Sequence, residues 1–416
     1  MKEQQRYLFI DYLRGFIFAL MAVDHALHAY AQNWGQFWFI ADHDRSEIWD
    51  AFYLFDQSII MPMLFFITGL WVIPSLKRHG FQKYLSRRLV KLAIPFVVCI
   101  PLIVPLLTYP RYILTIDPMI GYFEYWFNVF LSGKKLQAGP LWVMYGMFLY
   151  SMILVAFNTI PNFMVRWSNF IRHLVDKPIF GFSFILLLSA LILGISDLTW
   201  GAPWWIGWGV FYLQGARFLL YFLYFMLGAG VSYSGLLEDR FFWKRLTDRL
   251  PLWAGGMLAA AFAYVGYALF FIQDGAYSDT VRYAFHDFFT VEGSWSMITH
   301  FLNHQGWELI LDHAPRILIR TTLHGILCLF QVLTLLAFFY KYINKQHATW
   351  DSLAQSCYGI FLTHEAMVIW LQYIFIGIEL PQSLKIIIIS CLGLGGAWLL
   401  TEKWLLKIPL LKKVIG

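Results

Sequence analysis

Long apolar runs separated by short polar segments dominate the pattern of hydrophobic and polar positions along this chain of 416 residues. A helix needs about 20 apolar residues to cross the hydrocarbon core of a bilayer. We predict ten membrane-spanning helices, at residues 8–30, 52–76, 89–109, 140–160, 179–198, 215–234, 251–273, 317–341, 352–378 and 384–405. The predicted fold is therefore all-α: a polytopic membrane helix bundle that forms a single domain over residues 1–416, with no appended soluble domain.

The composition supports this fold class. Hydrophobic residues make up 59% of the chain and charged residues 13%, whereas a soluble domain carries about 25% charged residues. The four cysteines all fall inside apolar runs, so their spacing predicts neither a disulfide framework nor a zinc site. We expect no metal, and we do not interpret the net charge of +6 as a sign of nucleic-acid binding.

Basic residues concentrate in every second polar segment. The basic segments are residues 77–91, 161–178, 235–250, 341–351 and 403–413. The alternate segments, such as residues 41–50, are acidic or neutral. Because cytoplasmic loops carry an excess of Lys and Arg, this alternation predicts that both termini are cytoplasmic. The first run is interrupted early by Asp11 and Arg14 and is too long for a signal peptide, so we interpret it as an uncleaved span.

That first span carries unusual charge for a membrane helix. Its ionisable residues are Asp11, Arg14, Asp24, His25 and His28. A charged residue near the centre of a spanning helix costs roughly 2.5–3.5 kcal/mol on insertion scales. Residues that cost so much usually face a protein interior or a wet cavity.

Arg14 and His25 are eleven residues apart, which places them on one helix face about 16 Å apart along the axis. An arginine can bind a phosphate bidentately, and a neutral imidazole can accept a proton from a hydroxyl group. The pair could therefore act at two depths of one cavity. The alternative is that Arg14 only pairs with Asp11 one turn away, and that His25 only lies at the membrane interface.

A second basic cluster precedes the third span. It comprises Lys83, Arg87, Arg88 and Lys91, just ahead of Pro95. These side chains could form a phosphate-binding rim. They could equally anchor the protein at the cytoplasmic lipid headgroups.

The ninth predicted span contains His364 and Glu365 well inside an apolar helix, with Ser356 and Tyr358 nearer its start. Ionisable residues within a membrane span are functional candidates, although polar residues also join helices by hydrogen bonds. We favour function for His364 and packing for Ser356 and Tyr358. The same two interpretations apply to two residues of the eighth span, Arg320 and His324.

Three outer segments are rich in aromatic residues, carboxylates or imidazoles: residues 110–139, 199–213 and 274–316. Such residues suit a sugar-like acceptor. They are equally typical of an interfacial cap and a solvated acidic loop.

Several stretches resemble motifs of the acyltransferase-3 family of integral membrane acyltransferases, which includes O-antigen acetylases and a periplasmic glucan succinylase. They are Asp11–His25 (DYLRGFIFALMAVDH), Met61–Gly69 (MPMLFFITG), Leu85–Pro95, Gly139–Trp142 (GPLW) and Cys357–His364 (CYGIFLTH). The resemblance covers nearly the whole chain in order. Two positions depart from the family pattern: Lys91 replaces the second Arg of the basic motif, and Cys357 replaces a Ser.

The resemblance implies acyl transfer from a cytoplasmic acyl-CoA, acetyl-CoA or succinyl-CoA, to a hydroxyl of a cell-envelope or periplasmic carbohydrate. It implies a location in the bacterial inner membrane. His25 would be the general base, with Arg14 and His364 also catalytic. The residues expected to bind the acyl-CoA are Arg14, Arg87, Arg88 and Lys91, and those expected to contact the substrate are Asp24, His28, Trp142 and Glu365.

Three other functions remain open at this stage. A secondary transporter or flippase could use Arg14, His25, His364 and Glu365 as a proton and anion path, although the chain lacks the internal repeats typical of transporters. A non-catalytic membrane scaffold would not need these residues. N-acyl transfer to an amino sugar is the third alternative.

Overall fold

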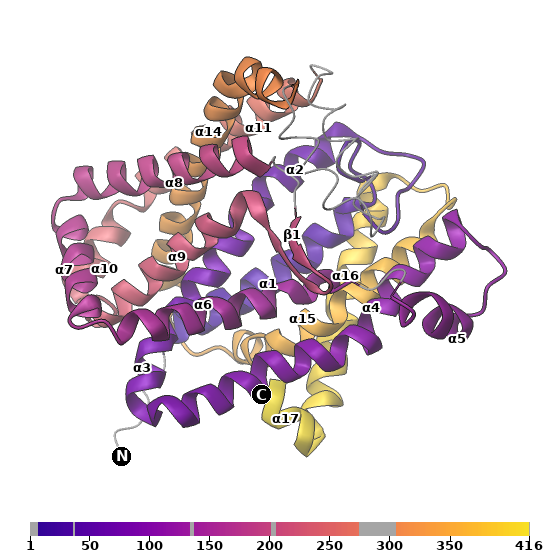
Figure 1. Ribbon diagram of the computed structural model, residues 1–416, viewed down its shortest axis with the longest axis horizontal. Coiled ribbons are helices and arrows are strands. Elements are labelled where there is room, and N and C mark those ends of the chain that lie inside the picture. The colour runs from indigo at the N-terminus through magenta and orange to yellow at the C-terminus, as the bar shows by residue number, and fades with distance from the viewer. Residues whose placement is uncertain (1–6, 36–37, 134–136, 201–204, 274–304, 416) are drawn as a thin grey trace.

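Each of the ten predicted spans lies on a long helix of the protein. The computed structural model describes residues 7–35, 38–133, 137–200, 205–273 and 305–415. The ten helices are α1 (Leu8–His28), α3 (Ile60–Arg88), α4 (Ile94–Thr115), α6 (Trp142–Asn158), α8 (Pro178–Trp200), α9 (Gly215–Tyr233), α11 (Leu250–Gln273), α14 (Gln305–Tyr342), α15 (Ala348–Phe375) and α16 (Gln382–Lys403). They pack side by side in one bundle (Figure 1).

Shorter helical elements connect these helices. They are α2 (Glu47–Gln57), α5 (Tyr122–Tyr125), α7 (Phe163–Asp176), α10 (Arg240–Asp248) and α17 (Pro409–Ile415), with the π-helical turns η2 (Leu89–Ala93) and η3 (Trp126–Phe130) and the 3-10 turns η4 (Gly139–Leu141) and η5 (Leu405–Lys407). The amphipathic helices α7 and α10 are both at the left end of the bundle in Figure 1, whereas α2 lies away from that end. Both α7 and α10 fall in segments that the sequence predicts to be cytoplasmic.

Six segments of the described residues are long and apolar enough to cross a membrane. They are Glu47–Thr115, Gly139–Asn158, Pro178–Asp197, Leu250–Phe270, Ala314–Tyr342 and Gln382–Lys407. The first of them contains two predicted spans, so the six segments account for seven of the ten. Of the remaining helices, α1 and α15 carry charged and polar side chains that lower their hydropathy, whereas the apolar stretch of α9, Arg217–Tyr233, is shorter than the other segments. The total of ten spans and the cytoplasmic termini therefore stay predictions.

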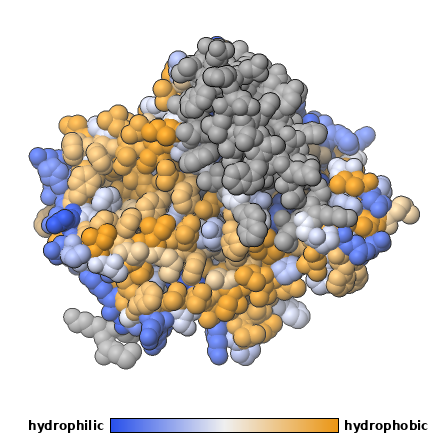
Figure 2. Space-filling model, viewed as in Figure 1, coloured by the Kyte–Doolittle hydropathy of each residue, from blue (hydrophilic) through white to orange (hydrophobic). Residues whose placement is uncertain are grey.

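The outer surface of the bundle is apolar, as a lipid-facing surface requires. Leu187 on α8 is 68% exposed, and Phe262 on α11 is 85% exposed. Figure 2 shows apolar residues over the broad face of the helices and hydrophilic residues at its edges. In water an apolar surface of this size would be an aggregation liability, whereas in a bilayer it contacts lipid.

A short β-hairpin interrupts the otherwise helical fold, which confirms the predicted all-α class. Strands β1 (Trp205–Trp208) and β2 (Phe211–Gln214) pair antiparallel within the Trp-rich segment. The two-residue loop between them begins at Gly209, whose φ is 61°. Glycine reaches positive φ at little cost, and two-residue hairpin loops need it.

A close approach between α3 and α9 explains one motif glycine. A Cβ atom added at Gly69 on α3 would lie 2.0 Å from the carbonyl oxygen of Phe225 on α9. A Cβ atom added at Gly228 would lie 2.0 Å from the carbonyl oxygen of Phe66. The two backbones therefore touch where small residues permit it, as is common between membrane helices.

We predict that Gly69→Ala separates α3 from α9 and destabilises the protein by roughly 1–3 kcal/mol, the usual cost of overpacking. The measurement is thermal unfolding of purified protein in detergent. Gly255→Ala on α11 is the matched control, because a Cβ atom there meets nothing within 4 Å. Equal melting temperatures for the two variants would contradict the prediction.

Candidate active site

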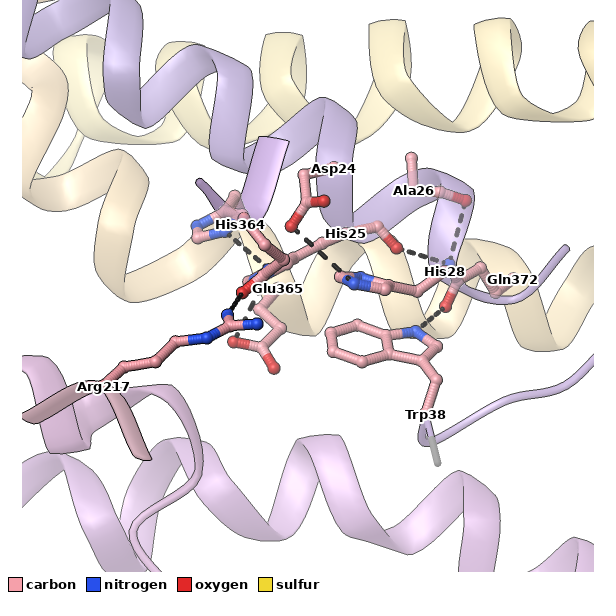
Figure 3. A network of polar contacts seen from close by, with 10 residues as sticks. Asp24, His25, Ala26, His28, Trp38, Arg217, His364, Glu365 and Gln372 are labelled. Atoms are coloured by element: carbon pink, nitrogen blue, oxygen red, sulfur yellow. Dashed lines mark hydrogen bonds and ion pairs between the residues drawn. The ribbon is translucent and has the colours of Figure 1, made fainter. Parts of the chain in front are cut away.

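The centre of the site is a pair of histidines contributed by two helices. His25 on α1 and His364 on α15 are 339 positions apart in the chain, yet His25 Nδ1 lies 3.1 Å from His364 Nε2. Their rings are nearly parallel, at an interplanar angle of 18° (Figure 3). Both residues were predicted as catalytic candidates, and the structure brings them into direct contact.

The hydrogen bonds of His364 define which nitrogen of His25 is available. His364 Nδ1 lies 2.7 Å from the carbonyl oxygen of Ile360. A carbonyl can only accept, so His364 Nδ1 must donate. In a neutral ring His364 Nε2 is then the acceptor, and His25 Nδ1 donates to it. This assignment leaves Nε2 of His25 with a free lone pair, as a general base requires.

Two buried carboxylates lie next to the histidines. Glu365 Oε2 lies 3.8 Å from His25 Nδ1, and Asp24 Oδ2 lies 3.8 Å from His28 Nε2. Glu365 Oε2 and Asp24 Oδ1 have no hydrogen-bond partner among the described residues. Buried polar atoms rarely stay unpaired, so these two oxygens are candidates for contact with a polar ligand.

Three of these residues could also hold a metal ion. Asp24, His25 and His28 each offer one ligand atom, and these atoms lie within 4.8 Å of one another. His25 Nδ1 already hydrogen-bonds His364, and the His28 ring stacks on Trp38 at 4.5 Å. These contacts account for the ring orientations without a metal.

Gln372 and Trp38 fix the end of α1, and sequence reasoning missed both. Gln372 Nε2 donates to the carbonyl oxygens of His25 at 2.8 Å and Ala26 at 3.1 Å, and Gln372 Oε1 accepts from Trp38 Nε1 at 2.8 Å (Figure 3). Carbonyls in the last turn of a helix lack intrahelical partners. Gln372 therefore ties the turn that carries His25 to α15.

Arg217 is the third residue that sequence reasoning missed. It lies near the start of α9, points toward Glu365 and His25 (Figure 3), and its Nη1 donates to Gln57 Oε1 at 3.1 Å. It lies at the edge of an apolar run, and the sequence analysis did not single it out.

A cavity of about 420 Å³ opens toward the other end of α1. Its polar wall includes Asp11, Arg14, Arg88 and Lys91. Its apolar wall includes Phe18 and Phe361, whose ring centroids are 5.5 Å apart. Phe361 precedes His364 by about one turn of α15. This cavity, which we call the inner cavity, therefore reaches to within about one helical turn of the histidine pair.

The basic residues of the inner cavity have defined neighbours. Arg14 Nη2 lies 3.6 Å from Asp11 Oδ1 and 3.4 Å from the carbonyl oxygen of Ala354. The sequence analysis gave the Arg14–Asp11 pair as the alternative to a functional role for Arg14. The pair forms, and both residues line the cavity. Arg88 Nε donates to the hydroxyl of Tyr84 at 3.0 Å.

Not every predicted residue reaches the cavity or the histidine pair. Arg87 and Lys83 are exposed and are not part of the cavity wall. Trp142 packs against Phe65 and Tyr221, at centroid distances of 6.4 and 6.1 Å. These placements leave the predicted ligand roles of Arg87 and Trp142 as predictions.

The two hydroxyl residues of α15 behave differently. The hydroxyl of Tyr358 donates to the carbonyl oxygen of Lys91, which joins α15 to η2. Ser356 Oγ is buried without a hydrogen-bond partner among the described residues. The predicted packing role therefore has a specific contact for Tyr358.

Several predicted outer-loop residues lie outside the described residues: His286, Asp287, Glu292, His300 and His304. Residues 201–204 of the Trp-rich segment do so as well.

Comparison with known proteins now identifies the family. The model of the Acyl_transf_3 family, described as an acyltransferase domain, matches residues 7–402. No curated protein and no solved structure matches the chain. The match covers nearly all of the chain, and together with the long apolar helices it shows a multi-pass membrane protein. The chain thus belongs to the acyltransferase-3 family, as its motifs predicted.

Proposed function

We propose that this protein transfers a short acyl group, acetyl or succinyl, from cytoplasmic acyl-CoA to a hydroxyl of a cell-envelope or periplasmic carbohydrate, in a bacterial inner membrane. The observation that carries the proposal is that α1 and α15 both contribute residues to the basic inner cavity and to the histidine pair. The proposed site for the donor phosphate and the proposed general base therefore lie at different positions along the same two helices.

The donor would bind in the inner cavity. Arg14, Arg88 and Lys91 would bind the pyrophosphate of the acyl-CoA, since arginine matches phosphate geometry and lysine supplies a point charge. The pantetheine arm would extend between the apolar side chains toward Phe18 and Phe361. It would cross much of the roughly 16 Å that separates Arg14 from His25 along the helix.

The acyl transfer would use Nε2 of His25. The acceptor hydroxyl gives its proton to this nitrogen as its oxygen attacks the thioester carbonyl carbon, and the bond from that carbon to sulfur then breaks. The protonated His25 returns the proton to the thiolate, which leaves as free CoA. The products are an ester and a thiol, and His25 ends in its starting state.

The decisive experiment measures free CoA released from acetyl-CoA and from succinyl-CoA by the purified protein in lipid discs. A cell-envelope glycan extract serves as the acceptor, and the acylated product is detected by mass spectrometry. CoA release that requires both the protein and the extract would support the proposal. If neither donor releases CoA while vesicles show saturable solute or proton flux, the transporter interpretation replaces it.

The basic rim gives a matched test of donor binding. We predict that Arg88→Gln raises KM for acyl-CoA roughly 10- to 100-fold, because a hydrogen bond to a charged group contributes about 1.5–3 kcal/mol, while kcat changes little. The control is Arg87→Gln, which removes the same charge from the adjacent exposed position and should change KM less than about twofold. Equal effects of both variants would mean that only the general surface charge matters.

A further inference from the structure

A second polar cavity, which we call the outer cavity, is lined in part by Arg217, and the mechanism above assigns it no role. Its volume is about 30 Å³, and its wall includes Asp197, Arg217, Tyr264, Arg320 and His324. These residues come from α8, α9, α11 and α14. A single water needs roughly 10–15 Å³ in this measure, so the cavity has room for a group of a few atoms but not for a sugar ring.

The positive and negative side chains in the wall of the outer cavity do not balance. Arg320 forms an ion pair with Asp197, and both are buried. Arg217 hydrogen-bonds the neutral Gln57, and no carboxylate lies within ion-pair distance of it among the described residues. The cavity wall thus has one positive charge in excess.

His324 supplies an independent sign of a ligand. It is only 5% exposed, it lines the cavity, and its Nε2 has no hydrogen-bond partner among the described residues. A buried nitrogen without a hydrogen-bond partner destabilises the folded protein. A bound ligand atom that accepts a hydrogen bond from this nitrogen would remove that destabilisation.

We propose that the outer cavity binds a carboxylate, through the guanidinium of Arg217 and Nε2–H of His324. A carboxylate is anionic, accepts two hydrogen bonds and is small enough for the cavity. Arg217 lines this cavity and also points toward Glu365 and His25 (Figure 3), so the bound group would lie next to the reacting centre.

This inference rests on the proposed function, within which the carboxylate has two possible sources. It could be the free carboxylate of a dicarboxylic acyl group such as succinyl. It could also belong to an acidic sugar of the acceptor. The recognition chemistry is the same, and the choice of substrates in the test separates the two sources.

The test compares His324→Phe with wild type in four reactions: acetyl-CoA or succinyl-CoA as donor, each with a neutral glucan or a glucuronate-containing glycan as acceptor. We expect kcat/KM for the carboxylate-bearing substrate, relative to its neutral counterpart, to fall roughly 10- to 100-fold. His324→Gln, which keeps an N–H donor, should restore much of the ratio. His173→Phe, on an exposed position of α7, should leave the ratio unchanged.

A fall in the succinyl to acetyl ratio would assign the carboxylate to the donor. A fall in the glucuronate to glucan ratio would assign it to the acceptor. The same factor in all four reactions, or an unchanged ratio, would overturn the inference.

A binding measurement separates this inference from the proposed function. Succinate should raise the melting temperature of wild type more than succinamide does, and His324→Phe should lose that difference. If wild type transfers no acyl group but shows this stabilisation, the carboxylate site stands and the proposed function fails. If transfer occurs and succinate and succinamide act alike, the carboxylate site is refuted.

Discussion

His25→Ala should lower acyl transfer by roughly 10²–10⁴-fold, the range that a positioned general base contributes. His25 Nδ1 donates to His364, so Nε2 is the nitrogen left to accept the hydroxyl proton. Its removal leaves the acceptor to attack as a neutral alcohol. The loss should be in kcat, because the residues proposed to bind the donor, Arg14, Arg88 and Lys91, line the cavity toward the other end of α1.

Single-turnover transfer from acyl-CoA, with donor binding measured separately, checks this expectation. Donor affinity should change less than about threefold, since no interaction with the pyrophosphate is lost. His173→Ala removes an exposed histidine on α7 and should leave the rate unchanged. If His25→Ala retained more than a tenth of the wild-type rate, another group, with Glu365 the first candidate, would have to act as the base.

Local sequence reasoning succeeded where one helix carries the information. The separation of eleven positions from Arg14 to His25 gives both a shared face and an axial distance, and α1 (Leu8–His28) is a continuous helix over that interval. His364 was found for a different reason, because an ionisable residue in an apolar run is costly. The two halves of the site could therefore be predicted separately.

The contact between the two halves could not be predicted in the same way. His25 meets His364 across 339 positions, and Gln372 caps the end of α1 from α15. Helical periodicity describes one element and says nothing about which element it faces. Gln372 is an uncharged residue near the end of a span, so no cost of burial drew attention to it.

The basic cluster shows where helical geometry could not decide between neighbouring residues. Arg87 and Arg88 lie four and three positions before Lys91, and both spacings place side chains on one helix face. The structure places Arg88 and Lys91 in the cavity wall and leaves Arg87 exposed. The π-helical turn η2 (Leu89–Ala93) begins directly after Arg88, so which basic residues face inward could be read only from the structure.

His364→Phe should lower kcat by roughly 10²–10³-fold while KM for acyl-CoA stays nearly constant. Phenylalanine keeps the approximate shape of the ring but removes the acceptor for His25 Nδ1–H. His25 then loses the contact that sets its tautomer, and a wrong tautomer costs about 10⁴-fold in the serine protease triad. The expected loss is smaller here, because Glu365 Oε2 lies 3.8 Å from His25 Nδ1 and can partly replace the lost acceptor.

A double variant distinguishes positioning from independent catalysis. If His364 acts only through His25, adding His364→Phe to His25→Ala should cause little further loss, since residues that act as a unit are not additive. His364→Asn should recover part of the rate, because the side-chain oxygen of asparagine can accept a hydrogen bond from His25 Nδ1–H. Additive losses in the double variant would instead mean that His364 contacts a reacting group directly, and the two histidines would then have separate roles in the transfer.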